Sequence, residues 1–249
     1  MGSSEPMTTQ QRPLRLAILE ADTPVPGVLA KYGKYGSVFA HLFRQACAPD
    51  SLESQLTLSA HDVVNDPSSY PDPETLDAVL ITGSKHSAFE DHEWILRLVA
   101  YTKRLLEQPA ARPDGRPPVR VIGVCFGHQI VGRAMGAPVG RSDRGWELSV
   151  VDMALTDEGK RIFGGETLKI HHMHRDIVHE YPKGTIPPSP HRRLRHPGHF
   201  TEDIMREILE VRHKGGILPD SVFEDAMSRA PDAHDGVAIA RAFLKFLRE

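Results

Sequence analysis

The stretch that decides the fold is residues 119–136, which read VRVIGVCFGHQIVGRAMG. Its opening VRVIGV contains four β-branched residues, which predicts a short strand buried on both faces of a sheet. Apolar residues then recur at helical spacing through IVGRAM, which predicts a helix. Between the two, Gly123 and Gly127 bracket Cys125, and these small residues let the backbone turn sharply. A Gly-x-Cys-x-Gly pattern between a strand and a helix is typical of a nucleophile elbow, with the thiol at its apex.

The thiol of Cys125 can be interpreted as a nucleophile or as an ordinary buried cysteine. Backbone N–H groups at the start of a helix are unpaired and carry partial positive charge, so we expect them to lower the pKa of the thiol. The N–H of Phe126 should point at the oxyanion that forms when a thiolate attacks a carbonyl. The two flanking glycines favour the nucleophile over the structural cysteine.

The amino-acid composition is typical of a soluble globular protein. The chain has 249 residues, of which 40% are hydrophobic and 25% charged, and its net charge of −3 gives no reason to expect nucleic acid or a membrane as a partner. Two cysteines, Cys47 and Cys125, imply no disulfide framework, and we expect a cytoplasmic protein. Residues 1–13 are expected to form a disordered leader, and residues 14–249 a single domain.

Apolar segments along the chain predict an α/β fold. The predicted strands alternate with helices, which indicates a mostly parallel, flavodoxin-like sheet flanked by helices. The strands before the elbow are expected at 14–20, 56–64 and 76–83, and the helices at 38–46 and 94–105. After the elbow, 146–155 and 167–174 predict a hairpin-like pair of strands. The tail predicts two helices, the first capped by Thr201 with Ile204, Ile208 and Val211 facing inward, the second spanning 237–247.

Four motifs carry a resemblance to a known family: Ile81-Thr-Gly-Ser84, Gly123-Val-Cys-Phe-Gly-His-Gln129, Met173-His-Arg-Asp176 and Phe200-Thr-Glu-Asp203. Over residues 14–249 the chain resembles the class I glutamine amidotransferases. It is most similar to the stand-alone branch of amidotransferase-like and γ-glutamyl peptidase-like proteins. The cysteine motif is the specific one of the four, and the other three support it.

The resemblance implies a reaction and a set of site residues. A thiolate attacks the side-chain amide of glutamine, or a γ-glutamyl bond, and the resulting thioester is hydrolysed. No cofactor is implied. The implied residues are Cys125 as nucleophile, Gly83 and Phe126 as oxyanion donors, and Gln129, His174 and Asp176 at the substrate pocket.

The segment that should complete a catalytic triad departs from the family pattern. The family carries a strand ending in His-Pro-Glu directly before the last amphipathic helices. Here His196-Pro197 keeps the dipeptide, but Gly198 stands where the orienting carboxylate is expected. His196 is the candidate base and His199 the alternative. A deletion, a frameshift or a misplaced splice boundary would explain the mismatch, and sequencing the transcript across residues 182–200 would test that explanation.

Four histidines close together invite a metal interpretation: His171, His172, His174 and His179, with Asp176 as a further ligand. On a strand over 167–174, however, His172 and His174 share one face while His171 points to the other. No second cluster of cysteines or histidines completes a zinc site, so no metal is expected.

Three functions remain open from the sequence. The first is release of ammonia from glutamine for a separate synthetase subunit, since the chain has no phosphate-binding P-loop motif of its own. The second is a γ-glutamyl peptidase acting on glutathione-type conjugates. The third is a catalytically weak pseudoenzyme that serves as a scaffold, which the altered His-Pro-Glu segment keeps open.

Overall fold

The computed structural model describes residues 12–186 and 201–249, and its centre is a parallel four-stranded sheet in the order β2-β1-β3-β4. Leu16, Ile18 and their neighbours in β1 pair in parallel with both β2 and β3. The strands are β1 (Leu14–Glu20), β2 (Leu56–Asp62), β3 (Ala78–Ile81) and β4 (Arg120–Gly123). Parallel strands need crossover connections, and α-helices lie in those from β1 to β2 and from β3 to β4. The predicted α/β fold with a mostly parallel sheet is confirmed.

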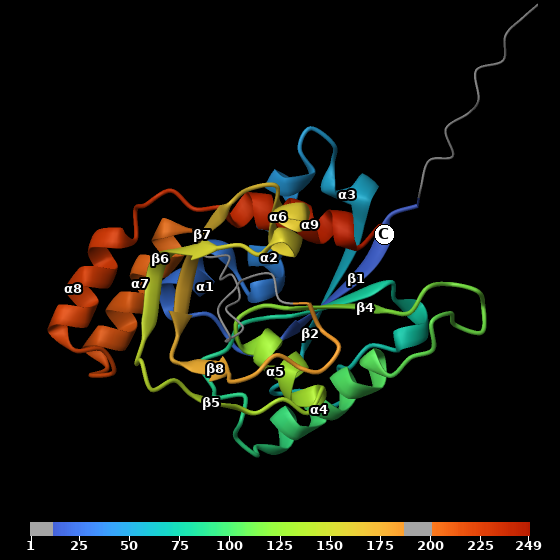
Figure 1. Cartoon of the computed structure of the whole chain (residues 1–249), viewed down its shortest axis with the longest axis horizontal. Coiled ribbons are helices and arrows are strands. Elements are labelled where there is room, and N and C mark those ends of the chain that lie inside the picture. The colour runs from blue at the N-terminus through green and yellow to red at the C-terminus, as the bar shows by residue number, and fades with distance from the viewer. Residues whose placement is uncertain (1–11, 187–200) are drawn as a thin grey trace, which may run out of the picture.

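Helices cover both faces of this sheet (Figure 1). On one face lie α2 (Tyr35–Cys47) and α9 (Gly236–Phe246), and on the other α4 (Glu93–Leu106) and α5 (Phe126–Ala134). Leu16 and Ile18 of β1 pack with α2 and α9, whereas Ala17 and Leu19 pack with α4 and α5. Successive side chains of a strand point to opposite faces, so a strand covered on both sides must be apolar throughout.

A smaller part of the molecule lies beside the sheet. β6 (Glu147–Ala154) pairs antiparallel with β7 (Thr167–His174), and α6 (Asp157–Phe163) connects them. A second short antiparallel pair joins β5 (Val139–Arg141) to β8 (Asp176–Val178). The helices α7 (Glu202–Lys214) and α8 (Asp220–Arg229) pack on one face of β6 and β7 (Figure 1). The predicted pairing of these two strands is therefore confirmed, but they form a two-stranded sheet of their own and do not extend an edge of the main sheet.

Four helices and one core position differ from the sequence-based expectation. The sequence analysis places no helix at α1 (Pro26–Tyr32), α3 (Leu52–Gln55), α6 or α8. In α1 the proline lies in the first turn, a position where the missing N–H costs nothing. The tail contains α8 between the two predicted helices. Val211 was predicted to face inward, yet it is 41% exposed, because it lies on the side of α7 that borders a cavity.

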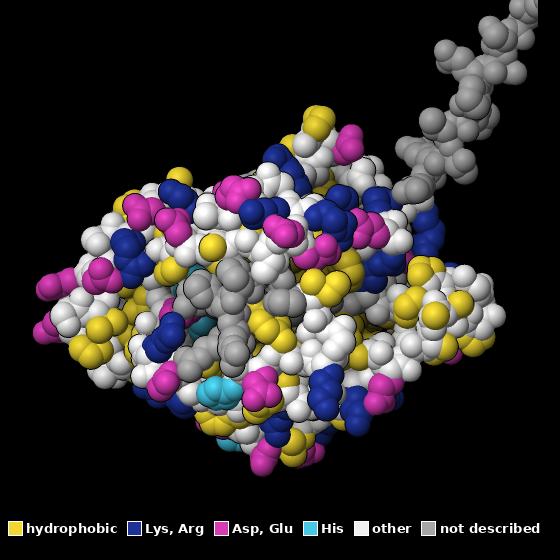
Figure 2. All heavy atoms as spheres, viewed as in Figure 1, with side chains coloured by type: hydrophobic (Ala, Val, Ile, Leu, Met, Phe, Trp, Pro, Cys, Tyr) yellow, Lys and Arg dark blue, Asp and Glu magenta, His cyan; other side chains and the backbone are white. Residues whose placement is uncertain are grey.

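Some predictions concern residues outside those described. These are the leader as far as residue 11 and the candidate bases His196 and His199. Among the described helices, none is both long and apolar enough to cross a membrane. Over the described part of the face in Figure 2, basic and acidic side chains are interspersed, without a continuous basic patch.

Candidate active site

Cys125 lies at the sharp turn between β4 and α5, in a backbone conformation that is rare for a residue with a side chain. Its φ is 51° and its ψ is −113°. Positive φ values bring Cβ close to the backbone, so such a residue persists only where its surroundings enforce the conformation. Here the strand before it and the helix after it leave no other path. The turn presents the side chain at the carboxyl end of the sheet, where ligands bind in open α/β proteins.

The two glycines of the elbow are required by contact with neighbouring backbone. A Cβ atom built on Gly127 would lie 2.2 Å from the carbonyl oxygen of Ile81, and one on Gly123 would lie 2.6 Å from the backbone nitrogen of His128. Neither backbone atom can move without separating α5 from β3 and β4. The glycines therefore permit the close approach of helix to sheet that holds Cys125 in place.

Two residues singled out from the sequence lie close to the sulfur of Cys125. The N–H of Phe126 donates a hydrogen bond to it. Gly83 is also near, because a Cβ added to it would come within 3.5 Å of Cβ and 4.0 Å of Sγ of Cys125. The fold therefore brings Gly83, Cys125 and Phe126 together, from the ends of two adjacent strands.

Burial of Cys125 decides the direction of its pKa shift. The residue is 8% exposed, and burial raises the pKa of the thiol to about 11, although the Phe126 N–H and the charge of Arg212 lower it. The predicted lowering by the helix start is therefore wrong in net sign. A thiolate in a low-dielectric site loses its hydration, and here that loss outweighs the attraction of one N–H group and one nearby cation.

Gln129 and Asp176 are both buried and are joined through the backbone. The side-chain amide of Gln129 donates to the carbonyl oxygen of Asp176 at 2.7 Å. The carboxylate of Asp176 lies 3.4 Å from the guanidinium of Arg141, its direct partner across the β5–β8 pair. Gln129 thus ties α5 to the segment that carries Asp176, and the carboxylate remains at the wall of a cavity.

His174 belongs to a buried polar cluster on one face of β6 and β7. Its Nε2 atom lies 2.8 Å from Nδ1 of His172 and 3.5 Å from the carboxylate of Glu147. Glu147 is the cross-strand partner of His174, and His172 lies two positions along on the same face. His171 points to the opposite face, where its ring packs against His234. The predicted separation of these histidines on β7 is confirmed.

Two cavities meet at Cys125. The smaller, of about 280 Å³, has mostly polar walls that include Gln129, His174 and Asp176. The larger, of about 490 Å³, has a mainly apolar wall. Its apolar lining residues are Pro24, Val25, Pro26, Tyr35, Met173, Ile208, Val211 and Ile217. Cys125 and Arg212 line both cavities, so the thiol faces a polar chamber on one side and an apolar one on the other.

Trp146 and Arg212 line the cavities but were not singled out from the sequence, and Arg175 was named only as part of the Met173–Asp176 motif. The guanidinium of Arg212 lies 5.2 Å from the centre of the Trp146 ring, and that of Arg175 lies 5.6 Å from it. Arg212 sits in the last turn of an amphipathic helix, where basic residues are common for reasons of helix charge alone. No local pattern distinguishes it from its neighbours.

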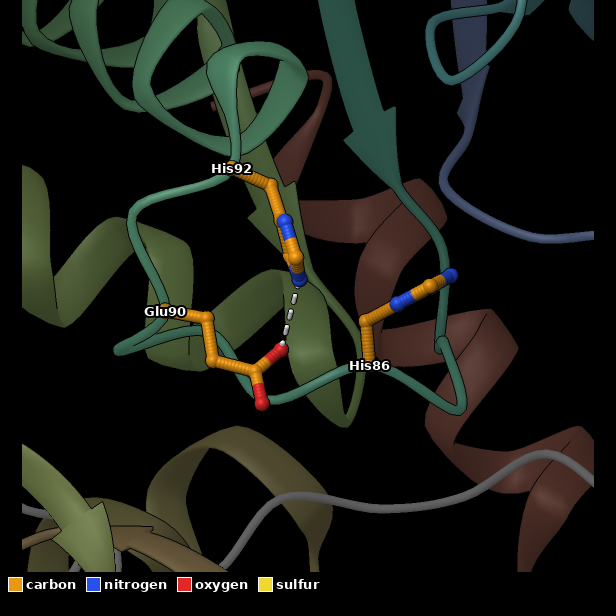
Figure 3. Close-up of side chains that lie close together, drawn as sticks. All are labelled: His86, Glu90 and His92. Carbon is orange, nitrogen blue, oxygen red and sulfur yellow. Dashed lines mark ion pairs between the residues drawn. The ribbon is translucent and has the colours of Figure 1, made fainter.

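Within residues 12–186 and 201–249, two groups of side chains could hold a metal ion. His86, Glu90 and His92 come from the loop between β3 and α4, and the ring of His92 points at the Glu90 carboxylate, 3.3 Å away, while His86 leans away from it (Figure 3). The second group is Glu147 with His172 and His174. In each group the ligand atoms lie within 4.8 Å of one another. The sequence pointed to His172 and His174 but not to Glu147, which comes from the other strand.

Comparison with known proteins identifies relatives along nearly the whole chain. Residues 101–192 match the family model described as glutamine amidotransferase class-I. A glutamine amidotransferase-like protein of Schizosaccharomyces pombe is 30% identical over 251 residues, which cover 94% of this chain and 98% of that protein. Gamma-glutamyl peptidase 2 of Arabidopsis thaliana is 26% identical over 196 residues, covering 70% of this chain and 75% of that protein.

A solved structure shares the fold. The crystal structure of a glutamine amidotransferase from Thermotoga maritima aligns with a TM-score of 0.64 and 13% sequence identity, over 96% of this chain and 100% of that one. At this identity the likeness concerns the fold, including the sheet and its covering helices.

Proposed function

The chain belongs to the class I glutamine amidotransferase family, and from this premise we propose that Cys125 cleaves a γ-glutamyl amide bond, with glutamine as the simplest substrate. The observation that carries the proposal is the geometry of the elbow. Cys125 is held at a φ of 51°, with the Phe126 N–H directed at its sulfur and with Gly83 close to its side chain. Such a turn holds a nucleophile and its oxyanion donors ready before the substrate arrives.

The proposed reaction has two steps. Sγ of Cys125 attacks the γ-carbonyl carbon, and the N–H groups of Phe126 and Gly83 stabilise the oxyanion that forms. The C–N bond then breaks, the amine leaves with the proton that the thiol gave up, and a γ-glutamyl thioester remains. Water attacks the thioester, which releases glutamate and restores the thiol.

The first step requires a base, because the pKa of the resting thiol is about 11. We propose His196 for this role, on the strength of its His-Pro dipeptide. Among the described residues, His174 is an imidazole at the wall of the smaller cavity, 3.5 Å from the Glu147 carboxylate. A neighbouring carboxylate orients an imidazole and stabilises its charged form. Replacing His196 and His174 separately by alanine distinguishes them, because loss of the base lowers kcat by orders of magnitude.

The identity of the leaving group separates two versions of this function. Ammonia would be used by a synthetase on another chain, and it needs no pocket of its own. The apolar cavity of about 490 Å³ beside Cys125 favours a larger leaving group, so the second candidate is hydrolysis of γ-glutamyl peptides or conjugates. The name of the Arabidopsis relative, a gamma-glutamyl peptidase, points the same way.

The experiment treats the purified protein with glutamine, with a γ-glutamyl dipeptide, and with a chloroketone analogue of glutamine that alkylates thiols. We expect glutamate release and a single alkylated cysteine, both lost in Cys125→Ser. Cys47→Ser is the matched control, because Cys47 is also buried but belongs to the core beside α2, and it should retain both. Alkylation of Cys125 without turnover would instead identify a pseudoenzyme. If Cys125 is neither alkylated nor needed, the proposal is wrong.

A further inference from the structure

Arg212 lies at the boundary between the two cavities. It reaches there from α7 and lines both chambers, as do Cys125 and four other residues: Ser84, Lys85, Met173 and Ile217. Its guanidinium lies 5.2 Å from the centre of the Trp146 ring. The charge of Arg212 also lowers the pKa of Cys125, which means that the guanidinium acts on the space around the thiol.

No acidic group among residues 12–186 and 201–249 is ion-paired with Arg212. Two other cations of the cavity walls do have such partners: Lys85 lies 2.7 Å from Asp22, and Arg141 lies 3.4 Å from Asp176. Burial lowers the pKa of Arg212, although a guanidinium remains charged at every physiological pH. The carboxylates of Asp22 and Asp176 act on Arg212 from a distance without forming an ion pair with it. Because this compensates its burial only in part, an anionic ligand in direct contact would stabilise the guanidinium further.

The geometry of Arg212 favours a carboxylate as that ligand. A guanidinium over the face of an indole is held by the ring, and its N–H donors then point outward in the plane of the group. This arrangement matches the two oxygens of a carboxylate, which pair with arginine through two parallel hydrogen bonds. Arg175 lies against the same indole but lines only the smaller cavity, so Arg212 alone of the two faces the larger one.

The two cavities suit the two halves of a γ-glutamyl substrate. The glutamyl half is small and carries its own amino and carboxyl groups, which fits the polar chamber with Gln129, Asp176 and Arg141. The leaving group then lies in the larger chamber, against Val25, Ile208 and other apolar residues. Arg212 stands where a carboxylate close to the scissile amide of that leaving group would lie.

We propose that Arg212 binds the carboxylate of the leaving group, so that the preferred substrates are γ-glutamyl amino acids or peptides with an apolar side chain beside a free carboxylate. The inference rests on the proposed function in its γ-glutamyl peptidase form. In this role Arg212 determines substrate specificity. Glutamine has no carboxylate on its leaving group, so its binding is not strengthened by Arg212.

The test compares two ligands that differ only in the carboxylate, γ-glutamyl-phenylalanine and γ-glutamyl-phenethylamide. Binding is measured by calorimetry to Cys125→Ala, which cannot turn them over, with and without Arg212→Gln. We expect Arg212→Gln to weaken binding of γ-glutamyl-phenylalanine by about 10- to 100-fold, the value of a hydrogen-bonded charge pair, and to leave the phenethylamide within about 3-fold. Arg212→Lys should restore part of the difference, because it keeps the charge without the two parallel donors.

Arg206→Gln is the matched control, because Arg206 lies on the same helix, pairs with Glu202 on the surface and lines neither cavity. It should change neither affinity, and thermal unfolding should show each variant to be folded. The inference is overturned if the unmodified Arg212 protein binds the two ligands with equal affinity, if Arg212→Gln weakens the binding of both equally, or if neither ligand binds. Hydrolysis is measured separately on the protein with Cys125 intact. If binding depends on the carboxylate but no hydrolysis is seen, the proposed reaction is wrong, while the role of Arg212 in binding stands.

Discussion

At the scale of single residues, the site depends on glycines that lack a side chain as well as on the cysteine itself. Cys125 is placed by a strained turn, and the turn is possible because Gly123 and Gly127 have no Cβ. The same turn that exposes the thiol to two cavities also buries it, which raises its pKa to about 11. In the reaction that we propose, Cys125 is therefore positioned by the backbone but not activated by it, and another group has to remove the proton of the thiol.

Gly127→Ala should disrupt both the stability and the site. The new methyl group would lie 2.2 Å from the carbonyl oxygen of Ile81, so α5 must move away from β3. We expect the free energy of unfolding in urea to fall by about 2 kcal/mol or more, as in overpacked cores, and alkylation of Cys125 by the chloroketone to slow. Gly165→Ala is the control, because its nearest contact would be an ordinary 3.4 Å. An unchanged urea midpoint for Gly127→Ala would contradict the close approach of α5 to β3.

At the scale of elements, the two faces of β7 carry histidines with different neighbours. His172 and His174 join Glu147 on one face, and His174 also lines the smaller cavity. His171, on the other face, is fully buried against His234, which precedes α9. Burial, and to a lesser extent the neighbouring His234, lowers the pKa of His171 to about 4. A strand with two kinds of histidine thus links the site to the packing of the last helix.

His171 should make the fold sensitive to acid. In the unfolded chain a histidine binds its proton near pH 6.5, whereas folded His171 resists it until about pH 4. Stability is therefore complete above pH 6.5 and falls as the pH drops toward 4, by about 2 kcal/mol at pH 4.5. Urea unfolding of His171→Phe should show a shallower loss over this range, and His41→Phe, at an exposed position, should keep the full loss. Equal slopes for His171→Phe and the unmodified protein would refute this assignment.

At the scale of the whole molecule, segments far apart in the chain converge at the two ends of the sheet. The carboxyl ends of β3 and β4 provide Gly83 and Cys125, and β6 and α7 bring Trp146 and Arg212 beside them. At the opposite end, Asp77 just before β3 accepts hydrogen bonds from the Arg12 side chain and the Arg15 backbone. Burial alone would raise the pKa of Asp77, but these hydrogen bonds bring it well below its ordinary range.

Asp77→Asn should loosen this end of the sheet. The carboxylate is 11% exposed and lies within 4.0 Å of the guanidinium groups of Arg112 and Arg116 as well, so we expect a loss of about 2 kcal/mol at pH 7. The contribution of an ionised carboxylate is complete above the unfolded-state pKa near 3.9 and declines below it. The difference between Asp77→Asn and the unmodified protein should therefore shrink in urea titrations below pH 4. Asp114→Asn, at an exposed ion pair with Arg116, should have little effect at either pH.

Features encoded within a few consecutive residues could be predicted. The alternating apolar strands, the amphipathic helices α2 and α4, the Thr201 cap and the elbow around Cys125 each leave a local pattern. Short helices such as α1 and α8 leave a weaker one, and both were missed. Local patterns also separated His171 from His172 and His174, because neighbours on a strand always face opposite ways.

What the sequence determined by itself is the fold class, the family and the position of one thiol between a strand and a helix, because each depends on the order of neighbouring residues. Only the tertiary structure decided the direction of the Cys125 pKa shift, the two cavities on either side of the sulfur, and the place of Arg212 over Trp146. The burial of a site and the charge around it depend on groups from distant segments, here β3, β4, β6 and α7. No single stretch of the chain therefore determines them.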